Sequence, residues 1–221
     1  MEAEPSFWSL LAPSEQEAVE RIATRRTYPR RSVVYHHGDD TESVLVLRDG
    51  RVKVCAPGSD GHEAVLGFRG PGDLVGELGA IDGRARSASV ETLEPVLAYV
   101  CPRRDFRALV DSSPAVSGAM LRVVVERLRR ADAERTDFGS LDVLGRVARR
   151  LCELADRFGE VCDEGIQITL PVTQEELANW CGASREAVSK ALTQMRTMGW
   201  IETRRRVVVI SDDAQLRAYC D

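Results

Sequence analysis

The feature that most constrains this chain is a change in the spacing of its apolar residues after residue 101. Up to that point they form short runs and alternations separated by turn-forming residues. Strands at roughly ten-residue spacing with such turns between them are typical of an all-β sandwich or barrel, of which the jelly roll is one form. The expected strands are 33–35, 44–47, 52–54, 64–68 and 96–100, and the expected turns are Asp49-Gly50, Asp60-Gly61, Gly70–Asp73 and Asp82-Gly83.

A long helical segment follows the predicted strands. Pro114 suits the first position of a helix, a serine pair before it supplies the cap, and residues 115–137 contain one glycine and no proline. Within this segment, Leu121, Val125 and Leu128 follow the spacing of about 3.5 residues that forms the seam of a parallel two-helix coiled coil. Two interpretations stay open: the stripe pairs two copies of the chain, or it packs against the β domain.

The rest of the chain returns to shorter elements. Phe138-Gly139-Ser140 is expected to form a hinge, and a helix over 141–158 and a short strand over 166–170 follow it. We therefore expect an α+β fold in three parts. These are a β domain over 1–112, a long helix over 113–138 and a second domain over 139–221.

Composition limits what such a chain can do. With 221 residues, 43% of them hydrophobic and 29% charged, the chain suits two globular domains. Its net charge of −5 excludes a protein that coats nucleic acid through bulk positive charge, so any such contact must come from a local patch. The six cysteines show no C-x-x-C pair, so neither a metal site nor a disulfide framework is indicated. Because the N-terminus lacks a secretion signal, we expect a cytoplasmic protein without membrane contact.

Two short helices joined by a tight turn are predicted near the C-terminus. Thr173 with Glu176 three residues later forms a capping box that opens the first helix. The chain then turns at Gly182, and Ser184 caps the second helix. The sequence WIETRRRVVVI, which follows, reads as two strands around a basic turn. A helix-turn-helix followed by such a hairpin is a winged helix-turn-helix, a motif that binds DNA.

The second of these helices is the candidate recognition helix. Arg185 can bind guanine O6 and N7, Glu186 can accept from cytosine N4, and Lys190 can reach a second guanine. The alternative is a solvated polar face. Because residues 141–221 hold 11 Lys and Arg against 13 Asp and Glu, binding would depend on a patch and on salt concentration. The predicted DNA contacts are Thr173, Gln174, Ser184, Arg185, Glu186, Ser189, Lys190 and the wing-tip residues Arg204, Arg205 and Arg206.

A glycine-rich stretch in the β domain, GELGAIDGRARSA at residues 76–88, places one carboxylate and one guanidinium among small residues. Arg86 suits the equatorial oxygens of a phosphate group, through forked and charge-assisted hydrogen bonds. Backbone N–H groups at 76–79, in a short helical turn, would add an anion-binding nest. The alternative is a surface ion pair between Glu77 and Arg86 on a hairpin.

Together with LDVLGRVARRL and CGASREAVSKAL, this stretch resembles the cyclic-AMP receptor protein and FNR (CRP/FNR) family of bacterial transcription regulators, over nearly the full length of the chain. The resemblance implies a cyclic-nucleotide-binding jelly roll, a long dimerisation helix and a winged helix-turn-helix domain. It assigns the cyclic phosphate to Arg86 and the ribose 2′-hydroxyl to Glu77. The implied nucleotide-binding residues are Gly76, Glu77, Leu78, Gly79, Arg86, Ser87, Ala88, Ala131 and Asp132.

The positions expected to meet the base depart from the family pattern. Where the family commonly has Thr followed by Ser or Asn, this chain has Ala131 and Asp132, and Ala131 lacks the hydroxyl that would meet adenine. Asp132 could accept hydrogen bonds from guanine, with Ser87 assisting, or from the amino group of adenine. It could also be a solvated carboxylate, or one paired with Arg135. We rank cyclic AMP first as the ligand, cyclic GMP second and loss of ligand control third.

The resemblance also names partners. It implies a homodimer through Leu121, Val125 and Leu128, a palindromic double-stranded DNA site with half sites similar to TGTGA, and RNA polymerase as a further partner. A nucleotide that touches both the β domain and the long helix would raise DNA affinity. A regulatory subunit or effector-gated enzyme is disfavoured because residues 139–221 offer no nucleophile-base pair or metal set. A redox or haem sensor would need clustered cysteines or a ligating histidine. No catalytic residue, metal or cofactor is predicted.

Overall fold

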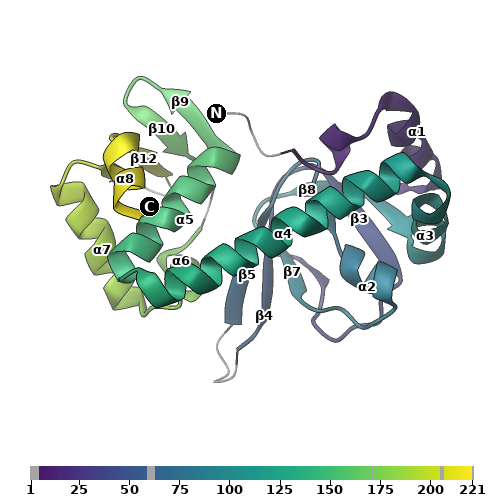
Figure 1. Cartoon of the computed structure of the whole chain (residues 1–221), viewed down its shortest axis with the longest axis horizontal. Helices are drawn as coiled ribbons and strands as arrows, with labels where there is room; N and C mark the ends of the chain where they lie inside the picture. The colour runs from purple at the N-terminus through teal and green to yellow at the C-terminus, as the bar shows by residue number, and fades with distance from the viewer. Residues whose placement is uncertain (1–4, 59–62, 171, 205–206, 221) are drawn as a thin grey trace. The chain divides into compact units, whose positions relative to one another are not determined.

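The structure, a computed structural model, describes residues 5–58, 63–170, 172–204 and 207–220 (Figure 1). The chain divides into two compact units, one of residues 5–129 and the other mainly of residues 130–221. One long helix, α4 (Pro114–Ser140), contributes residues to both units. Each unit is described here by itself.

The first unit is a β sandwich of two antiparallel four-stranded sheets, with strand orders β1-β8-β3-β6 and β2-β7-β4-β5. All five predicted strands are present, so the jelly-roll prediction is confirmed. The strands are β1 (Thr24–Tyr28), β2 (Val33–Tyr35), β3 (Ser43–Asp49), β4 (Val52–Pro57), β5 (Glu63–Arg69), β6 (Leu74–Val75), β7 (Ser89–Thr92) and β8 (Val96–Pro102).

Short helices accompany the sandwich: α1 (Pro13–Ile22), α2 (Glu77–Asp82), α3 (Arg103–Ser112) and a 3-10 turn at Trp8–Leu10. The predicted turn at Asp82-Gly83 is not a hairpin turn. Asp82 is the last residue of α2, and Gly83, at φ 79°, ends that helix in the left-handed conformation. Of the other predicted turns, Asp60-Gly61 lies outside the described residues. The helices α1 and α3 escaped prediction because each buries only one or two side chains.

The long helix α4 has two different apolar faces. Val116, Ala119 and Val123 are buried in the core of the β unit, together with Phe7, Phe106 and other side chains. The predicted stripe lies elsewhere on the helix: Leu121, Val125 and Leu128 are 63%, 40% and 60% exposed. The interpretation in which that stripe packs against the β domain is therefore wrong, because another set of residues does so.

The end of α4 also differs from expectation. The helix continues through Ser140, so Phe138-Gly139-Ser140 is helical and is not the predicted hinge. The chain leaves the helix at Leu141, and Asp142 starts the next one by accepting a hydrogen bond from the backbone N–H of Gly145 at 2.8 Å. A side-chain cap rather than the glycine sets this boundary.

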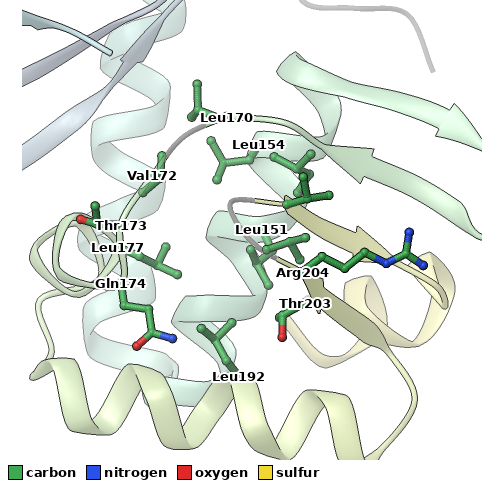
Figure 2. Close-up of a pocket in the computed structure, with 13 residues that line it drawn as sticks. Leu151, Leu154, Leu170, Val172, Thr173, Gln174, Leu177, Leu192, Thr203 and Arg204 are labelled. Atoms are coloured by element: carbon green, nitrogen blue, oxygen red, sulfur yellow. The ribbon is translucent and has the colours of Figure 1, made fainter. Parts of the chain in front are cut away.

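The second unit begins with α5 (Val143–Phe158), whose residues Leu144, Val147, Leu151 and Leu154 form a buried apolar face. A four-stranded antiparallel sheet of order β11-β12-β10-β9 and three further helices complete it. Leu151 and Leu154 of α5 line one pocket with Leu177 and Leu192 of the next two helices (Figure 2). The remaining elements are β9 (Gly159–Cys162), β10 (Gly165–Ile168), α6 (Gln174–Cys181), α7 (Arg185–Thr197), β11 (Ile201–Arg204), β12 (Val207–Ile210) and α8 (Asp213–Cys220).

The cysteines are all free thiols. Cys152 on α5 hydrogen-bonds Cys220 on α8, and this contact, together with burial, raises the pKa of Cys152. No group of His, Cys, Asp and Glu among the described residues could hold a metal ion. Within the same residues, no single helix is long and apolar enough to cross a membrane. The helices α3 and α4 reach that length and apolar character only when taken together, and the chain bends by 108° between them.

Candidate nucleotide and DNA sites

Arg86 is the centre of the predicted phosphate site, and it is almost fully buried, with 4% of its surface exposed. Its guanidinium donates hydrogen bonds to the carbonyls of Gly76, at 2.9 Å, and Ser43, at 2.6 Å. Its Cζ atom lies 3.6 Å from the ring centroid of Tyr35. No carboxylate among the described residues pairs with Arg86, and its buried Nε atom has no hydrogen-bond partner there. Since buried charges in proteins are usually paired, this arrangement suits an anion.

The small residues of this stretch make room first for the protein's own side chains. Gly76 has a φ of +83°, and a Cβ atom there would lie 2.2 Å from Nη1 of Arg86. A Cβ atom on Gly79 would lie 2.2 Å from Oγ1 of Thr41. The backbone N–H of Arg86 donates to the carbonyl of Asp39 at 2.8 Å. Gly76 is therefore needed to make room for the Arg86 guanidinium, and Gly79 to make room for Thr41.

Glu77 is the first residue of α2 and is also buried, with 4% of its surface exposed. Its Oε1 atom accepts a hydrogen bond from Nη1 of Arg127, whose Nη2 donates to the carbonyl of Leu74 at 2.6 Å. The interpretation of Glu77 and Arg86 as a surface ion pair is therefore wrong. Arg127 went unrecognised in the sequence because no short-range pattern connects residues 50 positions apart.

The other predicted nucleotide-binding residues differ in their placement. In the β unit, Leu78 is 47% exposed, Ser87 is exposed and Ala88 is half-buried. Ala131 and Asp132 belong to the other unit, where both are exposed. Their role toward a base stays a prediction. Asp132 forms no ion pair with any described residue, so the predicted pairing with Arg135 is not found.

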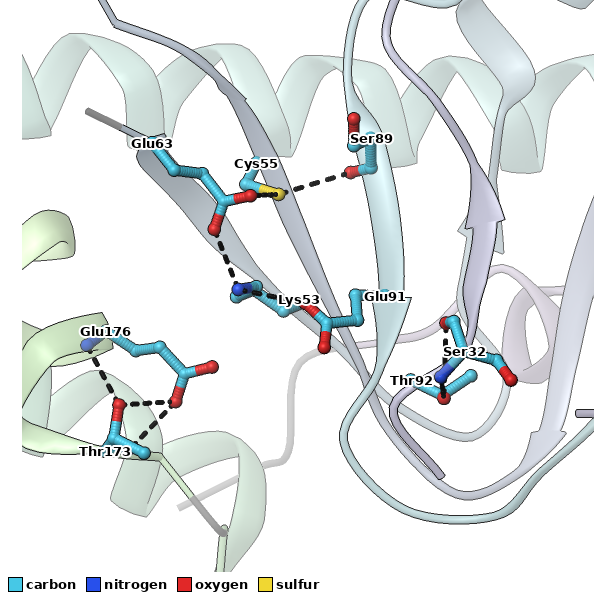
Figure 3. Close-up of polar contacts among 9 residues, drawn as sticks. All are labelled: Ser32, Lys53, Cys55, Glu63, Ser89, Glu91, Thr92, Thr173 and Glu176. Carbon is cyan, nitrogen blue, oxygen red and sulfur yellow. Dashed lines mark hydrogen bonds and ion pairs between the residues drawn. The ribbon is translucent and has the colours of Figure 1, made fainter. Parts of the chain in front are cut away.

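The helix-turn-helix forms as its capping residues predict. The Thr173 side chain accepts from the backbone N–H of Glu176, whose carboxylate accepts from the backbone N–H of Thr173, and Figure 3 shows this capping box. Gly182 ends α6 in the left-handed conformation, with a φ of 57°. The Ser184 hydroxyl then accepts from the backbone N–H of Ala187 and caps α7.

The turn at Gly182 also has a packing role. A Cβ atom there would lie 2.5 Å from the ring of Phe138. The Arg146 guanidinium lies over the same ring, with its Cζ atom 5.3 Å from the centroid, and its Nε atom donates to the carbonyl of Cys181 at 2.9 Å. The turn is therefore fastened to the end of α4, within the second unit.

The outward face of α7 carries the predicted base contacts. Its inward residues Val188, Leu192 and Met195 are buried. The predicted DNA contacts on this helix and around the start of α6 are exposed, except for Ser189, which is half-buried. The exposed residues are Thr173, Gln174, Ser184, Arg185, Glu186 and Lys190.

The wing is the hairpin of β11 and β12. Arg204 is the last residue of β11, and its guanidinium binds the carboxylates of Glu164, at 2.7 Å, and Glu202, at 3.3 Å. Arg204, which was predicted to contact DNA, therefore forms ion pairs within the protein in this structure. Arg205 and Arg206 lie outside the described residues.

Comparisons with known proteins agree with these two units. The family model of the cyclic nucleotide-binding domain matches residues 25–113, and that of the Crp-like helix-turn-helix domain matches residues 145–219. A cyclic nucleotide-binding domain and a helix-turn-helix domain on one chain define a transcription regulator.

Whole proteins match as well. The chain is 36% identical to the CRP-like cAMP-activated global transcriptional regulator of Mycobacterium tuberculosis, over 92% of this chain and 91% of the relative. It is 29% identical to the cyclic AMP receptor protein of Thermus thermophilus, over 98% and 96%. The structure of the c-di-GMP responsive global regulator CLP of Xanthomonas campestris superposes with a TM-score of 0.78 at 27% identity, covering 90% of this chain and 99% of that one. The chain belongs to the CRP/FNR family of transcription regulators.

Proposed function

We propose that this regulator binds DNA at a specific palindromic sequence and is controlled by a cyclic nucleotide held in its β domain. The observation that carries the ligand half is the burial of Arg86 without a carboxylate partner among the described residues. A cyclic phosphate would supply one negative charge and oxygens that can accept from the guanidinium. The small side chains of Ser87 and Ala88 would let the nucleotide approach the backbone.

Cyclic AMP is the first choice of ligand and cyclic GMP the second. The names of the two relatives described above support this order, because one is called cAMP-activated and the other a cyclic AMP receptor protein. The alternative is the same DNA-binding role with another effector. It is favoured by the X. campestris structure, whose title calls that regulator c-di-GMP responsive, and by Ala131, which offers adenine no hydroxyl.

The DNA half of the proposal rests on a homodimer. Leu121, Val125 and Leu128 form an apolar stripe that the β unit leaves exposed, which suits pairing with the same stripe of a second copy. Two-fold symmetry then presents two copies of α7, so the target is a palindrome. If the nucleotide binds more tightly to the arrangement that fits DNA, DNA must also raise nucleotide affinity by the same factor.

Titration calorimetry with cyclic AMP and with cyclic GMP tests the ligand half. We expect one of them to bind in the micromolar range, about −8 kcal/mol. Arg84→Ala is the matched control for Arg86→Ala, because Arg84 lies two residues away with its side chain 86% exposed. If neither nucleotide binds more tightly than roughly millimolar, about −4 kcal/mol, the ligand half is wrong.

Fluorescence anisotropy with a duplex that carries two TGTGA-like half sites tests the DNA half. We expect the nucleotide to increase affinity for this duplex more than for a scrambled one. Arg185→Ala should weaken binding to the palindrome by about 1–3 kcal/mol and affect the scrambled duplex less, because a base contact is lost. Equal affinity for both duplexes under all conditions would contradict sequence-specific recognition.

A further inference from the structure

The DNA-binding unit contains a pocket to which the proposed function assigns no ligand, although Thr173, Gln174 and Arg204 at its edge are also predicted DNA contacts. It has a volume of about 190 Å³ and lies among α5, α6, α7, the strand β10 and the wing (Figure 2). Its walls are mostly aliphatic. The side chains that matter for the argument are Leu151, Leu154, Ile168, Leu177, Leu192 and Val208.

The walls belong to the core of this unit. Leu151, Leu154 and Ile168 are 1%, 4% and 3% exposed, and Leu177 and Leu192 are 6% and 7% exposed. Protein interiors are normally packed so closely that voids larger than a water molecule are few. An apolar cavity of about 150 Å³ stays dry and binds benzene, so a pocket of this size and lining can hold a substituted benzene ring.

The charged group at the rim does not select an anionic ligand. Arg204 lines the pocket, but its guanidinium binds Glu164 and Glu202, and Figure 2 shows it directed away from the leucines. Its charge is therefore already balanced by carboxylates. A ligand with a carboxylate or phosphate would have to displace them.

Three uncharged polar side chains of the described residues also line the pocket, and two of them form hydrogen bonds within the protein. The Thr173 hydroxyl is part of the capping box of α6, and the Thr203 hydroxyl accepts a hydrogen bond from Arg196 at 3.1 Å. Gln174 is an exposed residue at the pocket's edge, and its side-chain amide forms no hydrogen bond with any described residue. An amide can donate and accept, so it suits one neutral polar group on a ligand.

We infer that this pocket binds a small neutral molecule the size of a substituted benzene, with its apolar ring among the leucines and a single hydroxyl or carbonyl group hydrogen-bonded to Gln174. The occupant would touch Leu192 on the inward face of α7 and Val208 of the wing at once. The site is separate from the proposed nucleotide site, because all of its described lining residues belong to the second unit.

The probes are p-cresol and p-xylene, which have nearly the same shape and differ in the hydroxyl group. Each is titrated into the full chain labelled at its Ile, Leu and Val methyl groups, and NMR shifts are followed. We expect saturable shifts at the pocket methyls with both probes, and p-cresol to bind at least threefold more tightly. In Gln174→Leu the two probes should bind equally, since the polar partner is gone.

Blocking variants complete the test. Val208→Phe should fill the pocket and weaken p-cresol binding at least tenfold, and Leu154→Phe is a second blocking variant in case the first misfolds. Val161→Phe is the matched control, because Val161 lies in the same unit, is 91% exposed and does not line the pocket. Shifts that do not saturate, that fall on other methyls, or that persist unchanged in both folded blocking variants would overturn the inference. So would equal binding of the two probes to the unmodified chain. The test needs neither nucleotide nor DNA, so its outcome is independent of the proposed function.

Discussion

Among the described residues, each of the two units buries one arginine, and the two arginines have different surroundings. Arg86 in the β unit and Arg150 in the DNA-binding unit are 4% and 5% exposed, and each lies over an aromatic ring. Arg150 also binds two carboxylates, those of Glu134 and Glu153, each at 2.9 Å. Within the described part of the chain, Arg86 contacts only backbone carbonyls and a ring.

This difference indicates a structural role for Arg150 and an anion-binding role for Arg86. The charge of Arg150 is balanced within the protein, so it contributes to the stability of its own unit. The charge of Arg86 is held in position by carbonyl dipoles but is not neutralised by any described carboxylate. Such a group gains most from an anion that arrives from outside.

The largest expected effect follows from removing Arg86, the buried arginine that has no described carboxylate partner. Arg86→Ala should lower cyclic-nucleotide affinity at least 100-fold, about 3 kcal/mol, because a buried, charge-assisted contact to phosphate is lost. Its unfolding free energy should stay within about 1 kcal/mol of the unmodified chain, since no ion pair is broken. Calorimetry and urea denaturation measure the two quantities. A large loss of stability with unchanged affinity would reverse the comparison.

Arg150→Ala should show the opposite pattern. We expect a loss of about 2 kcal/mol in the unfolding free energy. The loss is below the usual cost of breaking a buried pair because Glu134 and Glu153 have side chains 26% and 22% exposed and can rehydrate. Urea denaturation measures the loss, and Arg185→Ala, an exposed arginine of the same unit, serves as the control with a change within about 0.5 kcal/mol. Equal stability of the two variants would mean that Arg150 has no structural role.

The ring beneath Arg86 gives a smaller effect. Tyr35→Leu should lower nucleotide affinity about fivefold, near 1 kcal/mol, because the cation–π contact that orients the guanidinium is removed. Burial raises the pKa of Tyr35, so the phenol stays neutral, and its hydroxyl contacts Ser43. Tyr35→Phe keeps the ring and is the matched control. If both variants bind nucleotide alike, the hydroxyl rather than the ring supports Arg86, or neither does.

A third buried cation extends the comparison with the smallest effect. Lys53 on β4 is bound by Glu63 at 2.8 Å and Glu91 at 3.2 Å, as Figure 3 shows. Burial by itself would raise the pKa of Glu63, but hydrogen bonds from Cys55 and Lys53 outweigh it and hold that pKa below its usual value. A depressed carboxyl pKa stabilises the fold above the pKa of the unfolded chain, and this contribution is lost as the pH falls through the folded value.

The stability of the unmodified chain should therefore fall as the pH drops below about 4.5, the ordinary pKa of such a carboxyl. The contribution should be below about 1 kcal/mol, because the Glu63 side chain is 45% exposed and the pair is screened by solvent. Urea denaturation between pH 6 and pH 3 measures it against Glu63→Gln, whose curve should lack this component. If the unfolding free energies of the two proteins depended on pH in the same way, the ion pair between Lys53 and Glu63 would contribute nothing to stability.

Local patterns predicted five of the eight described strands of the β sandwich and the main helices of the second unit, but they missed others, among them α1, α3 and β1. The capping residues Thr173 and Ser184 mark the starts of α6 and α7, and the heptad-like spacing of Leu121, Val125 and Leu128 marks an exposed stripe. These features depend on residues a few positions apart. At Phe138-Gly139-Ser140 the prediction is wrong because two short-range rules compete: the helix continues through a glycine until Asp142 caps the next one.

The sequence by itself determined where α6 and α7 begin, which face of α7 is polar, and that Arg86 stands among small residues, because those properties follow from short-range periodicity, capping residues and composition. Only the tertiary structure decided that Arg127 pairs with Glu77, that the Ser43 and Gly76 carbonyls bind Arg86, and that the leucines of three helices surround a pocket. These are tertiary contacts between residues far apart in the chain. They are set by how the elements pack, which no spacing of neighbouring residues encodes.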